Sequence, residues 1–347
     1  MLLVQSNSMD SSNGIIDEAF GHLPSGWKVV PAPESAQSPF DGAFDLRSPG
    51  GGASRFVFQT KKRFEPRDVE QVVRTFSGLP PAVHPLLLAS FLSPRSREVL
   101  RGHGVSHADA TGTLWLSTAT IFVERTGETR VSATKDGPPR RSLRGPITGR
   151  VVRYLCDVSA PLKVREIAQG TNVHPGNVSR ILDLLERDLL VRRSRGAVEE
   201  VDWKALIRRW GPDLAKDRKM ETCLAPRGID DELARLRNAD LPYALTGSYA
   251  SASLAPAVIP ASLDIYVKSV REARAALALH EAEGVGNVRL IEAFDRVAFE
   301  RTIVWDDLIL ASPSQIAADL VTLPRRSADE LNELFSWMER NAADWRR

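Results

Sequence analysis

The chain has 347 residues, of which 43% are hydrophobic and 26% charged, and its formal net charge is +2. This is an ordinary globular balance, with enough apolar residues for the cores of two or three domains. The two cysteines, Cys156 and Cys223, form neither a CxxC pattern nor a cluster with histidine, which argues against a disulfide framework or a zinc site. The cysteine usage favours the reducing cytoplasm.

Nothing in the chain indicates a membrane. The N-terminus lacks a basic region followed by an apolar core, so we expect no secretory signal. The most apolar run, residues 79–92, is too short and too rich in proline to span a bilayer, and we expect it to form a buried helix. We therefore expect a cytoplasmic protein with no membrane partner.

The charge is distributed unevenly along the chain. Residues 139–219 hold 18 Lys and Arg against 10 Asp and Glu, a local charge of +8 that leaves −6 for the rest. A basic middle between acidic ends suggests that the middle meets a polyanion. The alternative is a solvated surface with arginine-rich linkers.

Residues 15–126 mix strand and helix signals. "FDGAFDL" and "RFVFQTKKRF" indicate two strands around a glycine-rich turn, with Asp41 and Asp45 before the second strand and Gln59-Thr60-Lys61 at its end. A restriction-endonuclease-like nuclease places acids and a Glu/Asp-x-Lys pattern here to hold Mg²⁺. Gln59 takes the acid's place, and a neutral amide lacks the charge that the metal needs. We expect a degenerate, non-catalytic domain; the alternative is a divergent Mg-dependent nuclease using Asp41, Asp45 and Lys61.

Two histidines follow, His103 and His107, close in sequence but with no third ligand evident. We interpret them as ordinary loop histidines and expect no metal site. Residues 127–148, rich in Gly, Pro, Ser and Arg, then predict a basic linker.

Residues 149–212 predict a winged helix-turn-helix domain. Pro175 suits the first position of its third helix, where Val178, Ile181, Leu182 and Leu185 form an inward stripe. Leu189–Val191 and Ala197–Val201 are expected to be strands around the tip "RRSRG". In this fold the third helix enters the major groove and the wing lies against the backbone or minor groove.

The other face of that helix carries the chemistry for reading DNA. Arginine favours guanine and asparagine favours adenine, and the wing arginines would neutralise phosphates. The alternative is a winged helix used for protein contacts. The residues expected to contact DNA are Asn172, His174, Gly176, Asn177, Ser179, Arg180, Arg192, Arg193 and Arg195.

Residues 220–347 return to mixed α/β. "YALTGSYA" and "LDIYV" place a Gly247-Ser248 turn after one strand and Asp264 on another, the arrangement of a nucleotidyltransferase. The two-metal mechanism needs paired carboxylates, yet Tyr266 stands where the second acid would be. We expect a nucleotidyltransferase-like fold without catalysis. Gly247 and Ser248 remain a candidate phosphate or effector site, and Asp306 or Asp307 a candidate third acid if the fold is an active transferase.

The stretches "YALTGSYA", "LDIYV", "NVRLIEAFD" and "LILASPSQIAADLVTLPRRSADELNELFSWM" resemble the C-terminal domain of the abortive-infection type IV antitoxins, the AbiEi family of transcriptional regulators. The resemblance extends over nearly the whole chain from about residue 23. It implies DNA binding, often as an autorepressor beside a nucleotidyltransferase-like toxin. The large N-terminal domain departs from the shortest members of the family.

The overall expectation is an α+β, multidomain chain: a restriction-endonuclease-like α/β domain (15–126), a winged helix-turn-helix and a nucleotidyltransferase-like α/β domain. We predict a non-enzymatic transcriptional regulator without cofactors. Its partner would be DNA, double-stranded by preference, with single-stranded DNA, a cognate toxin and a homodimer left open.

Overall fold

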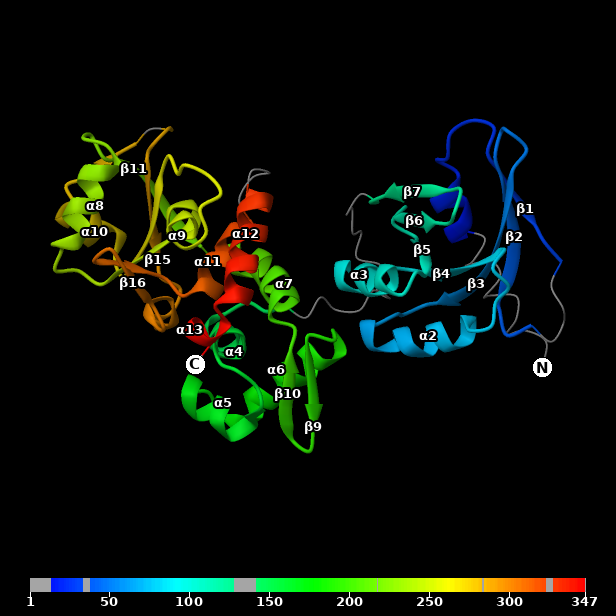
Figure 1. Ribbon diagram of the computed structural model, residues 1–347, viewed down its shortest axis with the longest axis horizontal. Helices are drawn as coiled ribbons and strands as arrows, with labels where there is room; N and C mark the ends of the chain where they lie inside the picture. The colour runs from blue at the N-terminus through cyan, green and yellow to red at the C-terminus, as the bar shows by residue number, and fades with distance from the viewer. Residues whose placement is uncertain are drawn as a thin grey trace. The chain divides into compact units, whose positions relative to one another are not determined.

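The computed structural model describes residues 14–33, 38–127, 142–216, 218–282, 284–322 and 327–346. The chain divides into two compact units, residues 1–140 and residues 141–347. Both combine helices with a seven-stranded sheet, which confirms a mixed α/β chain of more than one domain (Figure 1). None of the helices in these ranges is both long and apolar enough to cross a membrane.

The first unit is built on a sheet whose strands follow chain order from β1 to β7. The three central strands β3, β4 and β5 are parallel, and the others pair antiparallel. The strands are β1 (Lys28–Pro31), β2 (Gly42–Arg47), β3 (Ala53–Lys61), β4 (Val83–Ala89), β5 (Ser106–Asp109), β6 (Leu114–Ser117) and β7 (Phe122–Arg125). The helices are a segment at residues 14–20, η1 (Pro66–Asp68), α2 (Val69–Phe76) and α3 (Pro94–Gly102).

Strand β4 corrects the expected helix at residues 79–92. Leu86 and Leu88 belong to one apolar cluster and Leu87 and Ala89 to another, so successive side chains of β4 enter opposite faces of the sheet. A central parallel strand is covered on both faces and therefore reads as a continuous apolar run. Such a run cannot be told from a buried helix by its periodicity alone.

The sequence predicted that His107 lies in a loop, but it lies in β5. Its side chain is fully buried and its ring stacks on Trp115 at 5.5 Å between centroids. Nδ1 lies 3.3 Å from the carbonyl of Val105, while Nε2 has no partner among the described residues. Burial lowers the pKa of His107 to about 4.

The second unit begins with three helices and a small three-stranded sheet. The helices are α4 (Pro146–Asp157), α5 (Val164–Thr171) and α6 (Pro175–Arg187). The sheet has the order β8 (Leu162–Lys163), β10 (Ala197–Val201), β9 (Val191–Ser194). Helix α4 begins inside the expected linker 127–148, of which residues 128–141 lie outside the described ranges.

A second seven-stranded sheet follows, in the order β14-β11-β15-β13-β12-β17-β16. Its strands are β11 (Lys219–Leu224), β12 (Tyr243–Thr246), β13 (Leu263–Val267), β14 (His280–Glu281), β15 (Val288–Glu292), β16 (Ile303–Trp305) and β17 (Leu308–Leu310). Its helices are α8 (Ile229–Arg237), α9 (Gly247–Leu254), α10 (Val270–Ala276), η2 (Arg296–Phe299), α11 (Pro313–Leu320), α12 (Ser327–Arg340) and α13 (Ala342–Trp345).

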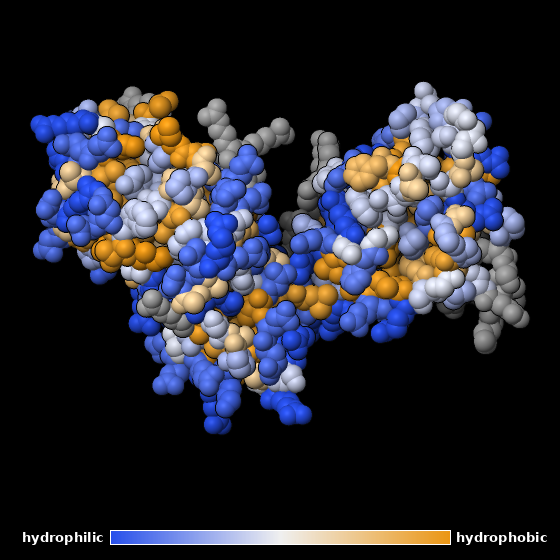
Figure 2. All heavy atoms as spheres, in the orientation of Figure 1, coloured by the Kyte–Doolittle hydropathy of each residue, from blue (hydrophilic) through white to orange (hydrophobic). Residues whose placement is uncertain are grey.

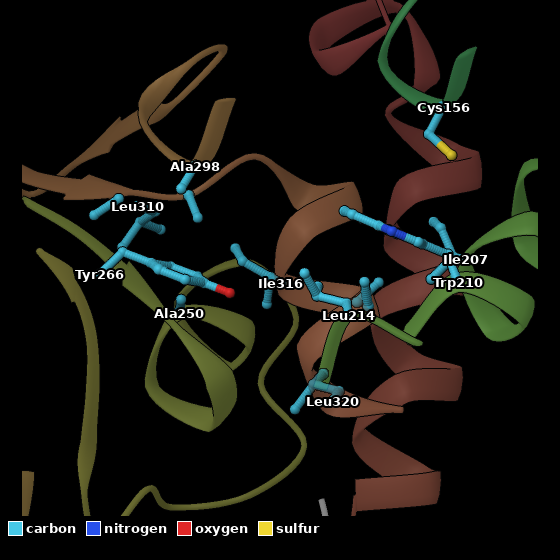
Figure 3. Close-up of a cluster of buried hydrophobic side chains, with 14 of the residues drawn as sticks. Cys156, Ile207, Trp210, Leu214, Ala250, Tyr266, Ala298, Leu310, Ile316 and Leu320 are labelled. Atoms are coloured by element: carbon cyan, nitrogen blue, oxygen red, sulfur yellow. The ribbon is translucent and has the colours of Figure 1, made fainter. Parts of the chain in front are cut away.

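Helix α7 (Trp203–Ala215) joins the two parts of this unit. The expected domain limit at residue 212 falls inside this helix. Trp210 and Leu214 of α7 point toward α11, with Tyr266 of β13 beyond it (Figure 3), and Ile207 belongs to the same apolar cluster. One apolar cluster therefore extends from α4–α6 through α7 into the large sheet.

A fully buried arginine reinforces this junction. Arg153 of α4 donates to Asp157 Oδ2 at 3.0 Å and to Gln315 Oε1 of α11 at 2.9 Å. It also donates to the carbonyls of Val297 and Glu300. A buried guanidinium is tolerated only when its donors are satisfied, so these bonds fix α4 against α11 and η2.

Candidate nucleic-acid interface

The turn between α5 and α6 is defined by local backbone chemistry. Asn172 ends α5 in the left-handed conformation, with φ of 52°. His174 caps α6, because its Nδ1 accepts the backbone N–H of Gly176 at 3.2 Å, and Pro175 is the first helical residue as expected. The turn therefore presents Asn172, His174 and Gly176, all exposed, at the start of α6.

The inward stripe of α6 is confirmed. Val178, Leu182 and Leu185 are completely buried, and Ile181 is half-buried against the same cluster. The opposite side carries Asn177 and Ser179, both half-buried, and the exposed Arg180.

Arg180 and Asn177 are neighbours on this face. Arg180 Nη1 donates to Asn177 Oδ1 at 3.2 Å, as residues three apart on a helix can. Within the described residues, the amide N–H₂ of Asn177 and the other guanidinium donors of Arg180 have no hydrogen-bond partner. The first turns of α6 thus offer a compact set of hydrogen-bonding groups beside the α5–α6 turn.

The hairpin of β9 and β10 differs from the expected wing. The tip is a two-residue turn, Arg195-Gly196, with φ of 49° and 81°. Leu189 is not in a strand: it has φ of 52° and is exposed, because the chain is still leaving α6 at this point. Arg192 and Arg193 consequently lie within β9 and not at the tip.

The three arginines of the hairpin are not equivalent. Arg192 forms an exposed pair with Glu200 on β10, at 3.0 Å. Arg193 is clamped by two acids of α6, Asp183 at 2.6 Å and Glu186, and its side chain is only 23% exposed. These acids raise the pKa of Arg193.

Arg195 is exposed at the tip and has no ion pair with any described residue. Figure 2 shows hydrophilic residues gathered over the end of the unit that carries this tip and α5. Arg165 of α5 is also exposed without an ion pair in the described ranges. Sequence reasoning missed Arg165, although its place at the start of α5 was a usable signal.

Part of the basic excess of residues 139–219 is neutralised by acids from elsewhere in the chain. Arg150 pairs with Asp295, Arg218 with Asp319, Lys204 with Glu339 and Lys219 with Glu292. The count of +8 therefore overstates the charge that this region presents to a polyanion. Exposed cations remain on α5, α6 and the hairpin, and also at other places in this stretch, such as Lys163 of β8 and Arg208 of α7.

The Gly247-Ser248 turn lies where β12 meets α9. Asp264 of β13 faces Thr246 across the strand pair and Arg289 across the neighbouring parallel strand β15. Arg289 holds both carboxylate oxygens of Asp264, with Nη2 at 2.6 Å from Oδ2. Burial raises the pKa of Asp264 and the arginine opposes this shift. A guanidinium thus neutralises the carboxylate that a metal ion would need.

The same turn has little freedom to accept an external anion. Gly247 has φ of 66°, and a Cβ there would overlap Asp264 Oδ2, so a carboxylate of the chain itself lies against the turn. Ser248 Oγ donates to Glu330 Oε2 at 2.8 Å. The adjoining cavity, of about 260 Å³, is lined by two arginines and two aspartates that pair with each other: Arg218, Asp319, Arg289 and Asp264.

Tyr266, in the position of the second acid, is completely buried. Its hydroxyl donates to Asp319 Oδ1 at 3.0 Å and accepts from Gln315 Nε2 at 3.0 Å. Asp306 and Asp307 form the turn before β17, whereas Asp264 lies level with the far end of β12. These two acids therefore lie at the opposite end of the strands from Asp264 and cannot complete a metal site with it.

In the first unit, the residues that the nuclease alternative requires do not come together either. Asp45 is held by Arg55 through two hydrogen bonds, at 2.8 and 3.1 Å, which lower its pKa. Arg55 precedes Lys61 by six positions on β3, which is on the order of 20 Å along a strand. Only Asp41 lies near Lys61, because its Oδ2 accepts the N–H of Thr60 at 2.6 Å.

No group of three or more His, Cys, Asp or Glu side chains that could hold a metal ion occurs within the described ranges. No protein-family model matches the chain, and no curated protein matches it. One solved structure, described as "Structure of EndoMS in apo form", matches over 29% of this chain and 45% of its own length. It is 19% identical, with a TM-score of 0.21, and so limited a likeness carries no argument about fold or activity.

Proposed function

We propose that this chain is a DNA-binding transcriptional regulator that binds an operator through α6 and the β9–β10 hairpin. The observation that carries the proposal is the outward face of α6. Its first turns and the preceding turn carry the exposed Asn172, His174 and Arg180 and the half-buried Asn177, opposite the buried Val178, Leu182 and Leu185. Helices of this kind read base edges from their N-terminal end.

In this proposal α4, α5, α6 and the small sheet act as a winged helix. Arg180 and Asn177 read bases, Ser179, His174 and Gly176 approach the backbone, and Arg195 contacts phosphate from the hairpin tip. The preferred partner is double-stranded DNA in the cytoplasm, because a helix of this width fits the major groove.

The two seven-stranded sheets have no catalytic role in this proposal. The first would be a degenerate restriction-endonuclease-like domain and the last a nucleotidyltransferase-like domain, in the order that the AbiEi-like regulators have. Support comes from two arginines that pair with the candidate metal-binding aspartates. Arg289 pairs with Asp264, and Arg55 pairs with Asp45.

The test is a mobility shift with the chain's own promoter, random duplex and single-stranded DNA, at two salt concentrations, with and without Mg²⁺. We expect promoter-selective, salt-sensitive binding that leaves the DNA intact. Absence of any DNA binding would refute the proposal. Cleavage that needs Mg²⁺ would favour the nuclease alternative instead.

A further inference from the structure

The first unit contains a cavity of about 810 Å³ that the proposed function does not use. Its walls come from the helical segment at residues 14–20, the loop after it, and strands β1, β2 and β3. Four aromatic side chains line it: Phe20, Trp27, Phe44 and Phe58. Cavities of this size with mainly apolar and aromatic walls are typical of sites that bind small molecules.

The aromatic walls are held in place by packing. The ring of Phe44 lies 5.3 Å from that of Phe20 and 6.2 Å from that of Phe58, between centroids. All three rings belong to one apolar cluster, and none is more than 7% exposed. The ring of Phe58 also lies against Gly42, where a Cβ would overlap it. The site is therefore preformed, and a ligand would lose little affinity to the ordering of its walls.

The charge in the cavity has one sign. Among the described residues, the charged side chains that line it are Asp17 and Asp41. The Asp17 carboxylate has no hydrogen bond or ion pair with any described residue. Asp41 Oδ2 accepts the N–H of Thr60 at 2.6 Å, and Oδ1 has no partner in the described part of the chain. The faces of the aromatic rings are also electronegative, so the walls favour a cation.

We propose that this cavity binds a small apolar molecule that carries a positive charge. The apolar part would lie against Phe20 and Phe44, and the charged group would lie near Asp41 and the indole of Trp27. Both a carboxylate and an aromatic face attract a cation. The same groups repel an anion such as a DNA phosphate. The site is therefore separate from the candidate nucleic-acid interface, and it is tested without DNA.

The first experiment compares two ions of nearly the same shape and opposite charge, tetraphenylphosphonium and tetraphenylborate. Calorimetry with the full chain, in a buffer free of potassium and DNA, measures the Kd of each. Tetraphenylphosphonium should bind once per chain, with a Kd at least about tenfold lower than that of tetraphenylborate. Equal affinity for the two ions would overturn the proposal. So would a chain that does not bind tetraphenylphosphonium, as expected if an apolar segment of the chain itself fills the cavity.

The second experiment removes the two charges without changing the shape of the cavity. Asp17→Asn and Asp41→Asn should each raise the Kd of tetraphenylphosphonium about threefold, and the double variant about tenfold. An asparagine at 41 can still accept the N–H of Thr60. The matched control is Glu70→Gln, which removes one exposed carboxylate from α2, where the buried side chains belong to the cluster on the other face of the sheet. An equal loss of affinity in the control would overturn the proposal.

The third experiment blocks the cavity. Ile16 lines it from the helical segment and is half-buried, so the larger ring of Ile16→Trp should occupy part of the space. This variant should keep the wild-type circular dichroism and bind neither ion. A folded Ile16→Trp chain that binds tetraphenylphosphonium as tightly as wild type would place the ligand elsewhere and overturn the proposal. The two asparagine variants test the site even if this variant fails to fold.

Discussion

In the proposed complex with DNA, Arg180 is the residue of α6 that we expect to distinguish one base from another. It is exposed and held toward Asn177 by a hydrogen bond of 3.2 Å. If it forms a paired contact with guanine, Arg180→Ala should reduce the preference for operator over random DNA by about 1–3 kcal/mol. Competition binding measures this ratio. Lys219→Ala, at an exposed site on β11, should leave the ratio unchanged.

Gly247 shows how one residue fixes the geometry of the turn. A Cβ would meet the Asp264 carboxylate, and φ of 66° is unfavourable for other residues. Gly247→Ala should therefore destabilise the protein by about 2 kcal/mol or more. Gly228→Ala is the matched control, since Gly228 has φ of 89° but open space around it. Urea denaturation should show the larger loss for Gly247→Ala; equal losses would mean that the carboxylate moves aside freely.

His107 gives the first unit a dependence on pH. Its folded pKa of about 4 lies below the usual value of 6.5, because burial disfavours the charged ring. The contribution of His107 to the stability of the folded state is therefore complete above about pH 6.5. It is lost as the pH falls toward 4, because in this range the unfolded state binds a proton at His107 and the folded state does not. The full effect is about 3 kcal/mol.

Comparing urea denaturation at pH 7.5 and pH 5 tests this. The wild-type chain should lose stability at the lower pH, and His107→Phe, which keeps a ring on Trp115, should lose less. Equal losses in the two proteins would show that His107 is not the group responsible.

At the scale of elements, the β9–β10 hairpin divides its charges between two roles. Arg195 at the tip has no ion pair among the described residues, whereas Arg193 is held by Asp183 and Glu186 of α6. Arg195→Ala should lower the slope of log K against log salt by about 1, as the loss of one phosphate contact does. Arg193→Ala should keep the slope but weaken binding to all sequences, because the hairpin is no longer fixed to α6. A reduced slope for Arg193→Ala would show that it too contacts phosphate.

Local signals in the sequence predicted α6 well. Pro175 and the spacing of Val178, Leu182 and Leu185 are properties of one helix, and each is where it was expected. The partners of the candidate site residues could not be predicted in this way. Arg289 reaches Asp264 only because β15 lies beside β13, and that neighbourhood is decided by the whole sheet.

At the scale of the molecule, α4–α6 do not have a separate core. Their buried residues belong to one apolar cluster with α7, α11 and the large sheet. Arg153 of α4 finds its partners on α11 and around η2. A ligand or a partner that shifts the large sheet would therefore act directly on the position of the helices that carry the candidate interface.

This shared core makes a prediction about fragments. Residues 142–216 alone would expose Trp210 and Leu214 and leave Arg153 without Gln315, at a cost of several kcal/mol. That fragment should be largely unfolded, although its limits include all of α4–α7. Residues 141–347 should fold and unfold in a single cooperative transition. Circular dichroism and urea denaturation of the two fragments decide this: a stable, cooperative 142–216 fragment would mean that α4–α6 are a domain in their own right and that the contacts with α11 are a docking surface.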